Sequence, residues 1–198
     1  GLSTAALSFL LGGSLGVAAG YLGGKTDEAV SFVINLMLCV PRLPVMIVIG
    51  AFWGQSAWNI ICIIAAFSWA AIARQMRAKT RSIRCAAYVQ IAESYGGSFW
   101  YIVTRHMLRE LLPLLAVGSL GVIGTSITQE SSLAYLGLSD PLARSWGLMI
   151  SRAAGFSGIF MTDFWKWWLL PPVLSLMGCV LCLRLLALEL ERLWLKEG

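Results

Sequence analysis

Few residues in this chain have the types and spacing that chemistry needs. Cys179 and Cys182 have the spacing of a redox or zinc pair, but this single pair lies within an apolar segment, which favours small packing residues. His106 is the only histidine, and no Cys or His stands near it at ligand spacing. We therefore predict no catalytic residue and no metal ligand, and no covalent chemistry.

The segment GYLGGKT, residues 20–26, ends like a phosphate-binding loop. That motif has four residues between its first glycine and the Gly-Lys pair, whereas Gly20 leaves only three. The motif also follows a strand, and here an apolar helix is expected before it. We expect no nucleotide or other cofactor to be bound by a motif of this chain.

Arg42 stands between Pro41 and Pro44 in the segment VPRLP, inside an apolar stretch. A charge at the centre of a bilayer costs about 2.5–3.5 kcal/mol on insertion scales, so such a residue usually faces a cavity or a partner. The prolines break the helix and free backbone groups that protein or water must satisfy. The wall or gate of a pore fits these features, and so does a snorkelling side chain or a structural ion pair.

The composition indicates whether the protein lies in water or in a lipid bilayer. The chain has 198 residues, of which 58% are hydrophobic and 13% are charged, against about 25% charged in soluble domains. A soluble core would need polar surface that this sequence does not supply, so a multi-pass membrane protein is predicted. The net charge of +5 is then a topology signal, and we expect no nucleic acid as a partner.

The elements that position these residues are expected to be helices throughout. Several apolar runs approach the roughly 20 residues that cross a bilayer. We predict an all-α polytopic protein, a single transmembrane domain over 1–198, with five spans at about 2–22, 29–50, 56–73, 112–134 and 168–190. The second span is interrupted by VPRLP.

The distribution of Lys and Arg predicts the orientation. The segment between the third and fourth spans holds seven of the fifteen basic residues: Arg74, Arg77, Lys79, Arg81, Arg84, Arg105 and Arg109. The positive-inside rule places this segment, including a loop at about 84–111, in the cytoplasm. Alternation then puts the C-terminus, with Arg192 and Lys196, inside, and the segment 139–166 outside.

Small residues recur at every fourth position of the first span: Thr4, Ser8, Gly12, Gly16 and Gly20. Such a stripe lets two helix backbones approach closely. It predicts a packing seam against another span or against a partner subunit.

Within the cytoplasmic loop, residues 86–113 contain two helical patterns separated by Gly96-Gly97. One apolar face is formed by Tyr88, Ile91, Ala92 and Tyr95, and the second pattern by Phe99, Ile102, Val103 and His106. Glycine closes the first helix and Ser98 caps the second. Two short amphipathic helices joined at a glycine corner suit docking into a groove of a soluble partner, or lying on the inner membrane surface.

Several motifs make the chain resemble a known family. YVQIAESYGGS followed by RHMLRE is similar to the cytoplasmic "EAA" loop of ABC importer permeases of the dipeptide, oligopeptide and nickel type. ESSLAYLGLSDP and SWGLMI resemble further motifs of that family. Gln90 stands where the family has Glu, Ile91 where it has Ala, and Arg109 where it has Pro. The family's Gly-Asp near the end of the last span is Ala187-Leu188 here. Its first span and outer Gly-Arg-Asp segment are not found upstream of Gly1, so an incomplete N-terminus is expected.

The resemblance implies a type-I importer permease fold and a role as half of a translocation pore in a prokaryotic plasma membrane. A second permease subunit, two cytoplasmic ATPases that carry ATP and Mg²⁺, and an extracytoplasmic solute-binding protein would be its partners. The residues expected to couple to the ATPases are Tyr88, Gln90, Ile91, Ala92, Glu93, Gly96, Gly97, Phe99 and His106. The cargo would be peptides, nickel or metal chelates.

Glu130 ends a polar run near the outer end of the fourth span and matches a Glu of the family. It is expected to line the outer gate or to contact the partner subunit. With Pro41, Arg42, Pro44, Gln129 and Tyr135, it forms the predicted translocation pathway. These features also suit an alternative, a secondary transporter or channel that works without ATPases.

Overall fold

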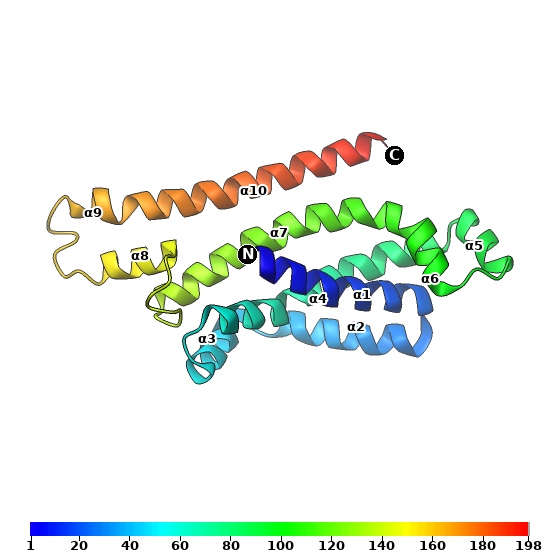
Figure 1. The fold of residues 1–198 in the computed structure, drawn as a ribbon, viewed down its shortest axis with the longest axis horizontal. Helices are drawn as coiled ribbons and strands as arrows, with labels where there is room; N and C mark the ends of the chain where they lie inside the picture. Colours follow the sequence, from blue (N-terminus) through cyan, green and yellow to red (C-terminus); the bar gives the residue numbers. More distant parts are fainter. Residues whose placement is uncertain (198) are drawn as a thin grey trace. The chain divides into compact units, whose positions relative to one another are not determined.

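The structure is a computed structural model that describes residues 1–197, and of residues 195–197 it describes the backbone alone. The side chain of Lys196, which entered the orientation prediction, and Gly198 lie outside the described residues. The described chain is helical and contains no strand (Figure 1). Its helices are α1 (Leu2–Leu22), α2 (Gly24–Cys39), α3 (Arg42–Trp53), α4 (Ala57–Arg84), α5 (Ala87–Ser94), α6 (Phe99–Ile102), α7 (Leu108–Tyr135), α8 (Trp146–Ala154), α9 (Phe164–Trp168) and α10 (Leu170–Glu197).

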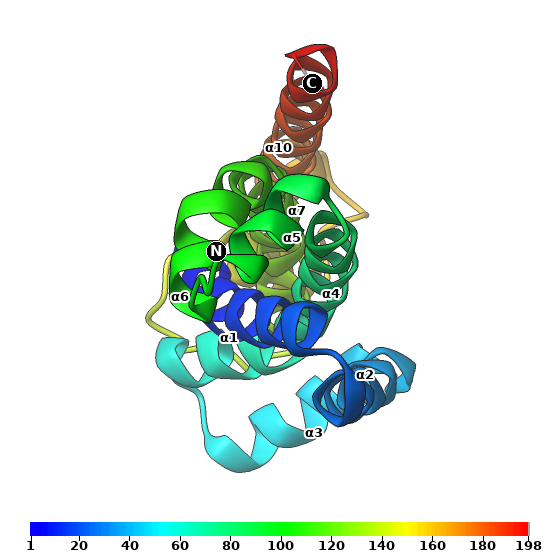
Figure 2. The same cartoon turned by 90° about the vertical axis from the view of Figure 1, so that its right-hand side faces the viewer.

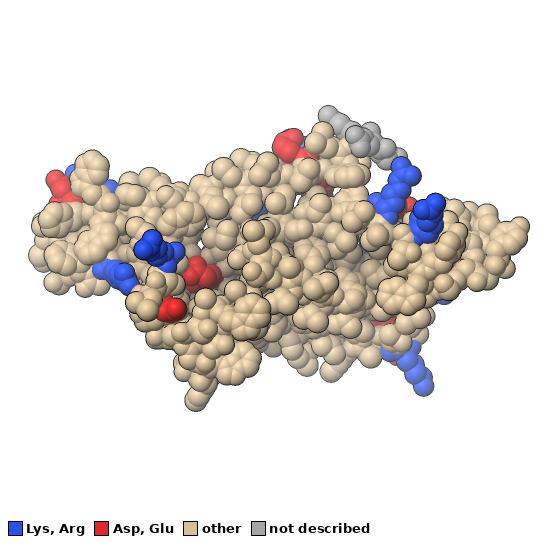
Figure 3. All heavy atoms as spheres, viewed as in Figure 1, with Lys and Arg blue, Asp and Glu red and all other residues tan. Residues whose placement is uncertain are grey.

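Four helical stretches are long and apolar enough to cross a membrane: Leu2–Leu22, Ala57–Arg84, Phe99–Tyr135 and Phe164–Trp194. A fifth span results if α2 and α3, which are bent by 86° at their break, are counted together. The break falls at Val40–Pro41, where proline holds the preceding residue in an extended conformation and so ends α2. Few charged side chains interrupt the surface in Figure 3. The all-α, polytopic fold with about five spans is confirmed.

The second short helix of the loop at about 84–111 differs from the prediction. Phe99–Ile102 continues through a π-helical turn at Val103–Met107 into α7, so that Phe99–Tyr135 forms one stretch of 37 residues. No glycine interrupts residues 99–117, and Pro113 is accommodated inside α7. The loop therefore consists of one short helix, α5, and the first turns of a spanning helix.

The described chain divides into two compact units. Unit 1 contains 1–5, 41–66 and 120–186, and unit 2 contains 6–40, 67–119 and the C-terminal segment from residue 187. The expectation of a single domain stays a prediction, and each unit is described by itself.

In unit 2, α1 packs directly on α4 through the glycine stripe (Figure 2). A Cβ added to Gly16 would lie 2.5 Å from the Ala73 carbonyl oxygen, and one added to Gly20 would lie 2.6 Å from the Arg77 carbonyl oxygen. A Cβ on Gly12 would meet the backbone of Trp69 and Ala73. The seam is thus formed with another span of the same chain, which decides between the two partners that the sequence allowed.

The helix α2 packs on the same part of α4. Ile34 is buried against Ala70 and Ala73. At the start of α2, the Asp27 carboxylate accepts two hydrogen bonds from the Arg77 guanidinium, and the Arg81 guanidinium lies 4.0 Å from it. Fork-to-fork pairing of this kind adds direction to the charge attraction, and it fixes the register of α2 on α4.

The Asp27–Arg77 pair should contribute measurably to stability. Asp27→Asn is expected to lower the free energy of unfolding by roughly 1–3 kcal/mol, because the half-buried guanidinium loses its charged acceptor. Melting of the purified protein in detergent measures the loss. Glu28→Gln is the matched control, since Glu28 is exposed on the same turn and has no ion pair among the described side chains. Equal melting temperatures of the two variants would contradict the prediction.

Candidate functional site

The loop at about 84–111, which the sequence predicts to be cytoplasmic, is built around the end of α5. The amide of Gly96 donates to the Glu93 carbonyl at 2.9 Å, and that of Gly97 donates to the Ala92 carbonyl at 3.0 Å. Gly96 has a φ of 80°, the left-handed conformation that this helix-closing arrangement requires. Ser98 then caps α6 by accepting a hydrogen bond from the Tyr101 amide at 3.4 Å. The predicted glycine corner is confirmed.

One face of α5 is apolar and unpacked. Val89 points inward and is fully buried, whereas Ile91 is 56% exposed and Tyr95 is 89% exposed. Tyr88 and Trp100 add further exposed aromatic surface. An apolar helix face that its own unit leaves uncovered is the geometry with which a helix enters the groove of a partner.

One ion pair and one hydrogen bond tie α5 to its neighbours. Arg84 at the end of α4 lies 3.6 Å from the Glu93 carboxylate. The hydroxyl of Tyr88 donates a hydrogen bond to Glu110 on α7, and Lys79 of α4 lies 3.1 Å from the same carboxylate. Partial burial, with the acceptor Glu110 beside it, raises the pKa of Tyr88 to about 12, so its hydroxyl keeps the proton that it donates. The Glu110 carboxylate therefore joins α4, α5 and α7 at one point.

Aromatic contacts connect the loop to α1. Phe99 packs edge-on against Tyr21 at the end of α1, with ring centroids 5.0 Å apart, and the Arg84 guanidinium lies 5.2 Å from the Tyr21 ring. His106 lies between Tyr88 and Tyr101, at centroid distances of 6.3 and 5.5 Å. These contacts make His106 a packing residue within this cluster.

The structure brings the predicted loop residues together on and around α5. Gln90 is exposed and its amide lies 3.4 Å from the Cys85 carbonyl. Beside it, a polar cavity of about 470 Å³ is lined by Asp27, Arg81, Arg84 and Glu93 as well as Gln90. The start of α2 and the end of α4 thus share one charged hollow with α5.

The predicted pathway residues lie on two elements, α3 with its N-cap and the second half of α7. Arg42 is the first residue of α3 and is half-buried, and neither it nor the two neighbouring prolines line the pocket that contains Glu130. Gln129 has a buried side-chain oxygen without a hydrogen-bond partner. Tyr135 is exposed at the end of α7.

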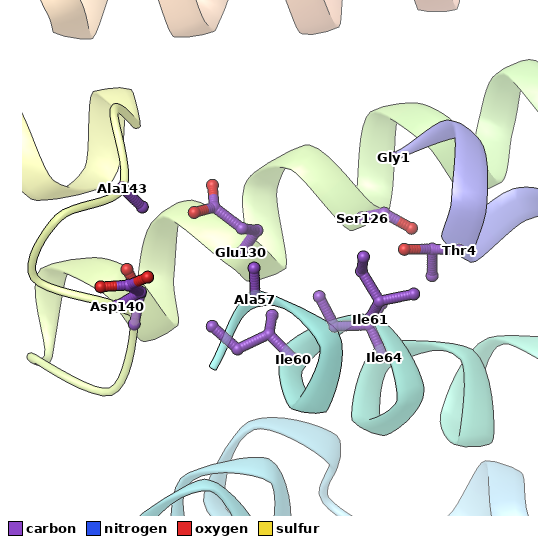
Figure 4. A pocket seen from close by; sticks show the side chains of 11 residues that line it. Gly1, Thr4, Ala57, Ile60, Ile61, Ile64, Ser126, Glu130, Asp140 and Ala143 are labelled. Carbon is purple, nitrogen blue, oxygen red and sulfur yellow. The ribbon is translucent and has the colours of Figure 1, made fainter. Parts of the chain in front are cut away.

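Glu130 lines a pocket of about 180 Å³ in unit 1, called here the acidic pocket (Figure 4). Its polar lining consists of Thr4, Ser126, Glu130, Ser139 and Asp140, and its apolar lining includes Ile60, Ile61 and Ile64 of α4. The turn that carries Ser139 and Asp140 follows the end of α7, where Gly137 has a φ of 79° and closes the helix as Gly96 closes α5.

Several of these residues were not singled out from the sequence. Glu110 and Lys79 are ordinary charges of a basic loop in the sequence, and only their meeting with Tyr88 gives them a place in the site. Asp140 belongs to the family motif ESSLAYLGLSDP, which by itself assigns it no role. The signal that could have found it is a second carboxylate ten residues after Glu130, just beyond a helix-closing Leu-Gly.

The apolar helices are those of a multi-pass membrane protein, and an ion pair and a hydrogen bond hold the exposed helix α5 against its neighbours. Residues 12–194 match the family described as "Binding-protein-dependent transport system inner membrane component". The chain belongs to this family, and the resemblance to ABC importer permeases of the peptide type is confirmed at that level.

Named relatives are similar over most of this chain. The probable D,D-dipeptide transport system permease protein DdpC of Escherichia coli K12 is 29% identical over 91% of the chain and 59% of its own length. The oligopeptide transport system permease protein OppC of Haemophilus influenzae is 30% identical over 92% of the chain and 57% of its own length. The glutathione transport system permease protein GsiD of Pectobacterium atrosepticum is 30% identical over 77% of the chain and 51% of its own length. The chain spans about half to three fifths of the length of these relatives.

Proposed function

We propose that this chain is the transmembrane subunit of an ATP-driven importer and supplies half of its translocation pore. The observation that carries the proposal is the exposed apolar face of α5, presented from a basic loop and anchored to α4 and α7. A cytoplasmic ATPase is the partner that this face would contact. ATP and Mg²⁺ would be bound by that partner, and a second permease subunit would complete the pore.

The anchoring contacts support a mechanical role for the loop. A push on α5 acts on α4 through Arg84–Glu93 and on α7 through Tyr88–Glu110, because a short ion pair or hydrogen bond resists separation. The Tyr21–Phe99 contact passes the same displacement to α1. Closure of the ATPases would in this way move three spanning helices together and alternate the access to the pore.

The proposed cargo is a small peptide that an extracytoplasmic solute-binding protein delivers. Three of the relatives are named for transport of D,D-dipeptides, oligopeptides and glutathione, all of which contain amide-linked amino acids. Nickel, the other cargo that the motifs allowed, is not in the names of these three relatives.

Isolation of the protein with its partners tests the proposal. The chain, purified from its native membrane in mild detergent, should bring with it a protein that hydrolyses ATP. Vesicles that contain the isolated complex should take up peptide only when ATP and the binding protein are both supplied. Uptake by the chain alone, without ATP, would instead identify a secondary transporter or a channel.

The proposed orientation has its own test in Cys85, which is exposed in the basic loop immediately before α5. A membrane-impermeant maleimide should label Cys85 in inside-out vesicles and leave it unlabelled in right-side-out vesicles. Cys85→Ser supplies the background from the four other cysteines, which all lie in helical spans. Labelling of Cys85 from the outer side would reverse the topology and contradict ATPase docking on α5.

A further inference from the structure

One turn between the loop at about 84–111 and the span α7 is not α-helical. At Val103–Met107 the chain forms a π-helical turn, in which the Leu108 amide donates to the Val103 carbonyl five residues earlier. The helix α6 precedes this turn and α7 follows it (Figure 1). A turn of this kind holds one residue more than the α-helical turn that it replaces, and such turns occur frequently at functional sites.

A buried stripe of side chains passes through the turn without changing sides. Ile102, Met107 and Leu111 are 0%, 0% and 1% exposed, and successive members are five and four residues apart. An α-helix advances about 100° per residue, so five residues would leave Ile102 roughly 140° away from Met107. Hydrogen bonding from i to i+5 instead brings residues five apart onto one side. The π turn therefore keeps Ile102 in the buried stripe.

A second stripe faces α5 and has the same spacing. It consists of Tyr101, His106 and Glu110. The rings of Tyr101 and His106 have centroids 5.5 Å apart. The Tyr88 ring of α5 lies 6.3 Å from the His106 ring, and its hydroxyl donates a hydrogen bond to Glu110. These contacts favour the π form, because an α-helical turn of the same residues would rotate Tyr101 away from His106.

The sequence also suits an α-helical form of this turn. In an unbroken α-helix, the residue four positions before Met107 shares its side, and that residue is Val103 in place of Ile102. Both are β-branched aliphatic residues, and Val103 is already half-buried. Ile102 would likewise take the place of Tyr101 beside His106. The change would rotate α6 by about 100° relative to α7 and still leave an apolar residue in the buried stripe.

We propose that this turn is a joint that changes from π-helix to α-helix during transport. Two hydrogen-bonding patterns of one segment form a bistable element, which a small displacement can switch. A load on α5 that separates Tyr88 from Glu110 would remove a contact that favours the π form. The helix α6 would then turn relative to α7, after the shared displacement of the spanning helices. The inference rests on the proposed function, because the ATPases supply the load.

Labelling of single cysteines tests the rotation directly. Ile102→Cys and Val103→Cys are introduced separately into the Cys85→Ser background, and the full complex in lipid nanodiscs is treated with a maleimide. A non-hydrolysable ATP analogue should raise the labelling rate of Ile102→Cys at least fivefold and lower that of Val103→Cys at least fivefold. Leu111→Cys, at a buried position within α7, is the matched control and should keep its rate. Any pattern other than opposite changes at 102 and 103 would overturn the inference.

Deletion of Thr104 should remove the second register. Thr104 is exposed and lies on neither stripe. Without it, Ile102 and Tyr101 stand four residues before Met107 and His106, so an unbroken α-helix retains both stripes. The deletion variant should bind the ATPase within a factor of two of wild type, whereas its ATP-driven uptake should fall at least tenfold. Thr104→Ala, which removes the same hydroxyl and keeps the residue count, is the matched control and should transport as wild type does.

Insertion of one alanine after Arg105 in the deletion variant should restore uptake, because it returns the extra residue. Wild-type uptake by the deletion variant would overturn the inference. Loss of ATPase binding together with uptake would also overturn it, since the turn would then only orient α5. If the deletion variant does not fold, the labelling rates decide. Constant labelling rates in a wild-type complex that couples ATP to uptake reject the joint alone, whereas a wild type that binds no ATPase rejects the proposed function.

Discussion

Ile91→Glu is expected to abolish ATP-driven uptake while the protein itself remains folded. Ile91 lies at the centre of the apolar face of α5 and is more than half exposed, so its replacement should change the stability of the free chain by no more than about 0.5 kcal/mol. In the complex, the same position would press a charge into an apolar groove of the ATPase. The loss of a central anchor costs about 2 kcal/mol or more, which is roughly a thirtyfold loss of affinity. Recovery of the ATPase with the purified chain and uptake in reconstituted vesicles measure the effect.

Ser94→Glu is the matched control for this result. It introduces the same charge on the same short helix, at an exposed position outside the apolar face. Its uptake and its ATPase recovery should stay within a factor of two of wild type. If Ile91→Glu transports as well as Ser94→Glu, the apolar face of α5 is not the docking surface.

Gly16→Ala should destabilise the protein by about 1–3 kcal/mol, although alanine is the better helix former. The new Cβ would lie 2.5 Å from the Ala73 carbonyl oxygen, 2.8 Å from the Met76 Cβ and 3.0 Å from the Ala73 Cα. Two of these atoms belong to the backbone of α4, so the two helices must move apart to relieve the contact, at the cost typical of overpacking. Thermal unfolding in detergent, followed by loss of the monodisperse peak, measures the change.

Gly13→Ala is the matched control, which separates the effect of contact with α4 from the effect of helix propensity on stability. Gly13 lies on the same helix three residues earlier, and a Cβ added there meets no atom within 4 Å. The substitution should leave stability unchanged or raise it by up to about 1 kcal/mol, since it removes only the flexibility of glycine. Equal loss at both positions would mean that helix propensity, and not the seam with α4, governs α1.

The glycine corner and the seam were readable in the sequence because both depend on residue types at short, regular spacing. Gly96-Gly97 ends a helix wherever it stands, since only the left-handed conformation of glycine closes α5 without a steric cost. The stripe at Gly12, Gly16 and Gly20 likewise indicates close helix contact by periodicity alone. The partner of that contact was open, because periodicity describes one surface and α4 supplies the other.

The continuity of α6 with α7 was missed for the opposite reason. The sequence has a clear stop before Ser98 and none after it, and Pro113 invites a break that the structure does not make. Whether a proline ends a helix or is accommodated depends on the packing around it, which a single segment does not encode.

The sequence by itself determined the apolar environment of the protein, the number of apolar spans, the place of the loop helix α5 along the chain and the family motifs, because composition, run length and local spacing carry this information. Only the tertiary structure decided which charges meet. Asp27 with Arg77, Glu93 with Arg84, and Glu110 with Tyr88 and Lys79 join residues from different helices, and the acidic pocket assembles Glu130 and Asp140 with serines that look ordinary in the chain. The physical reason is that a charge or a hydroxyl acts on whatever lies within a few ångströms, and sequence separation does not set that distance.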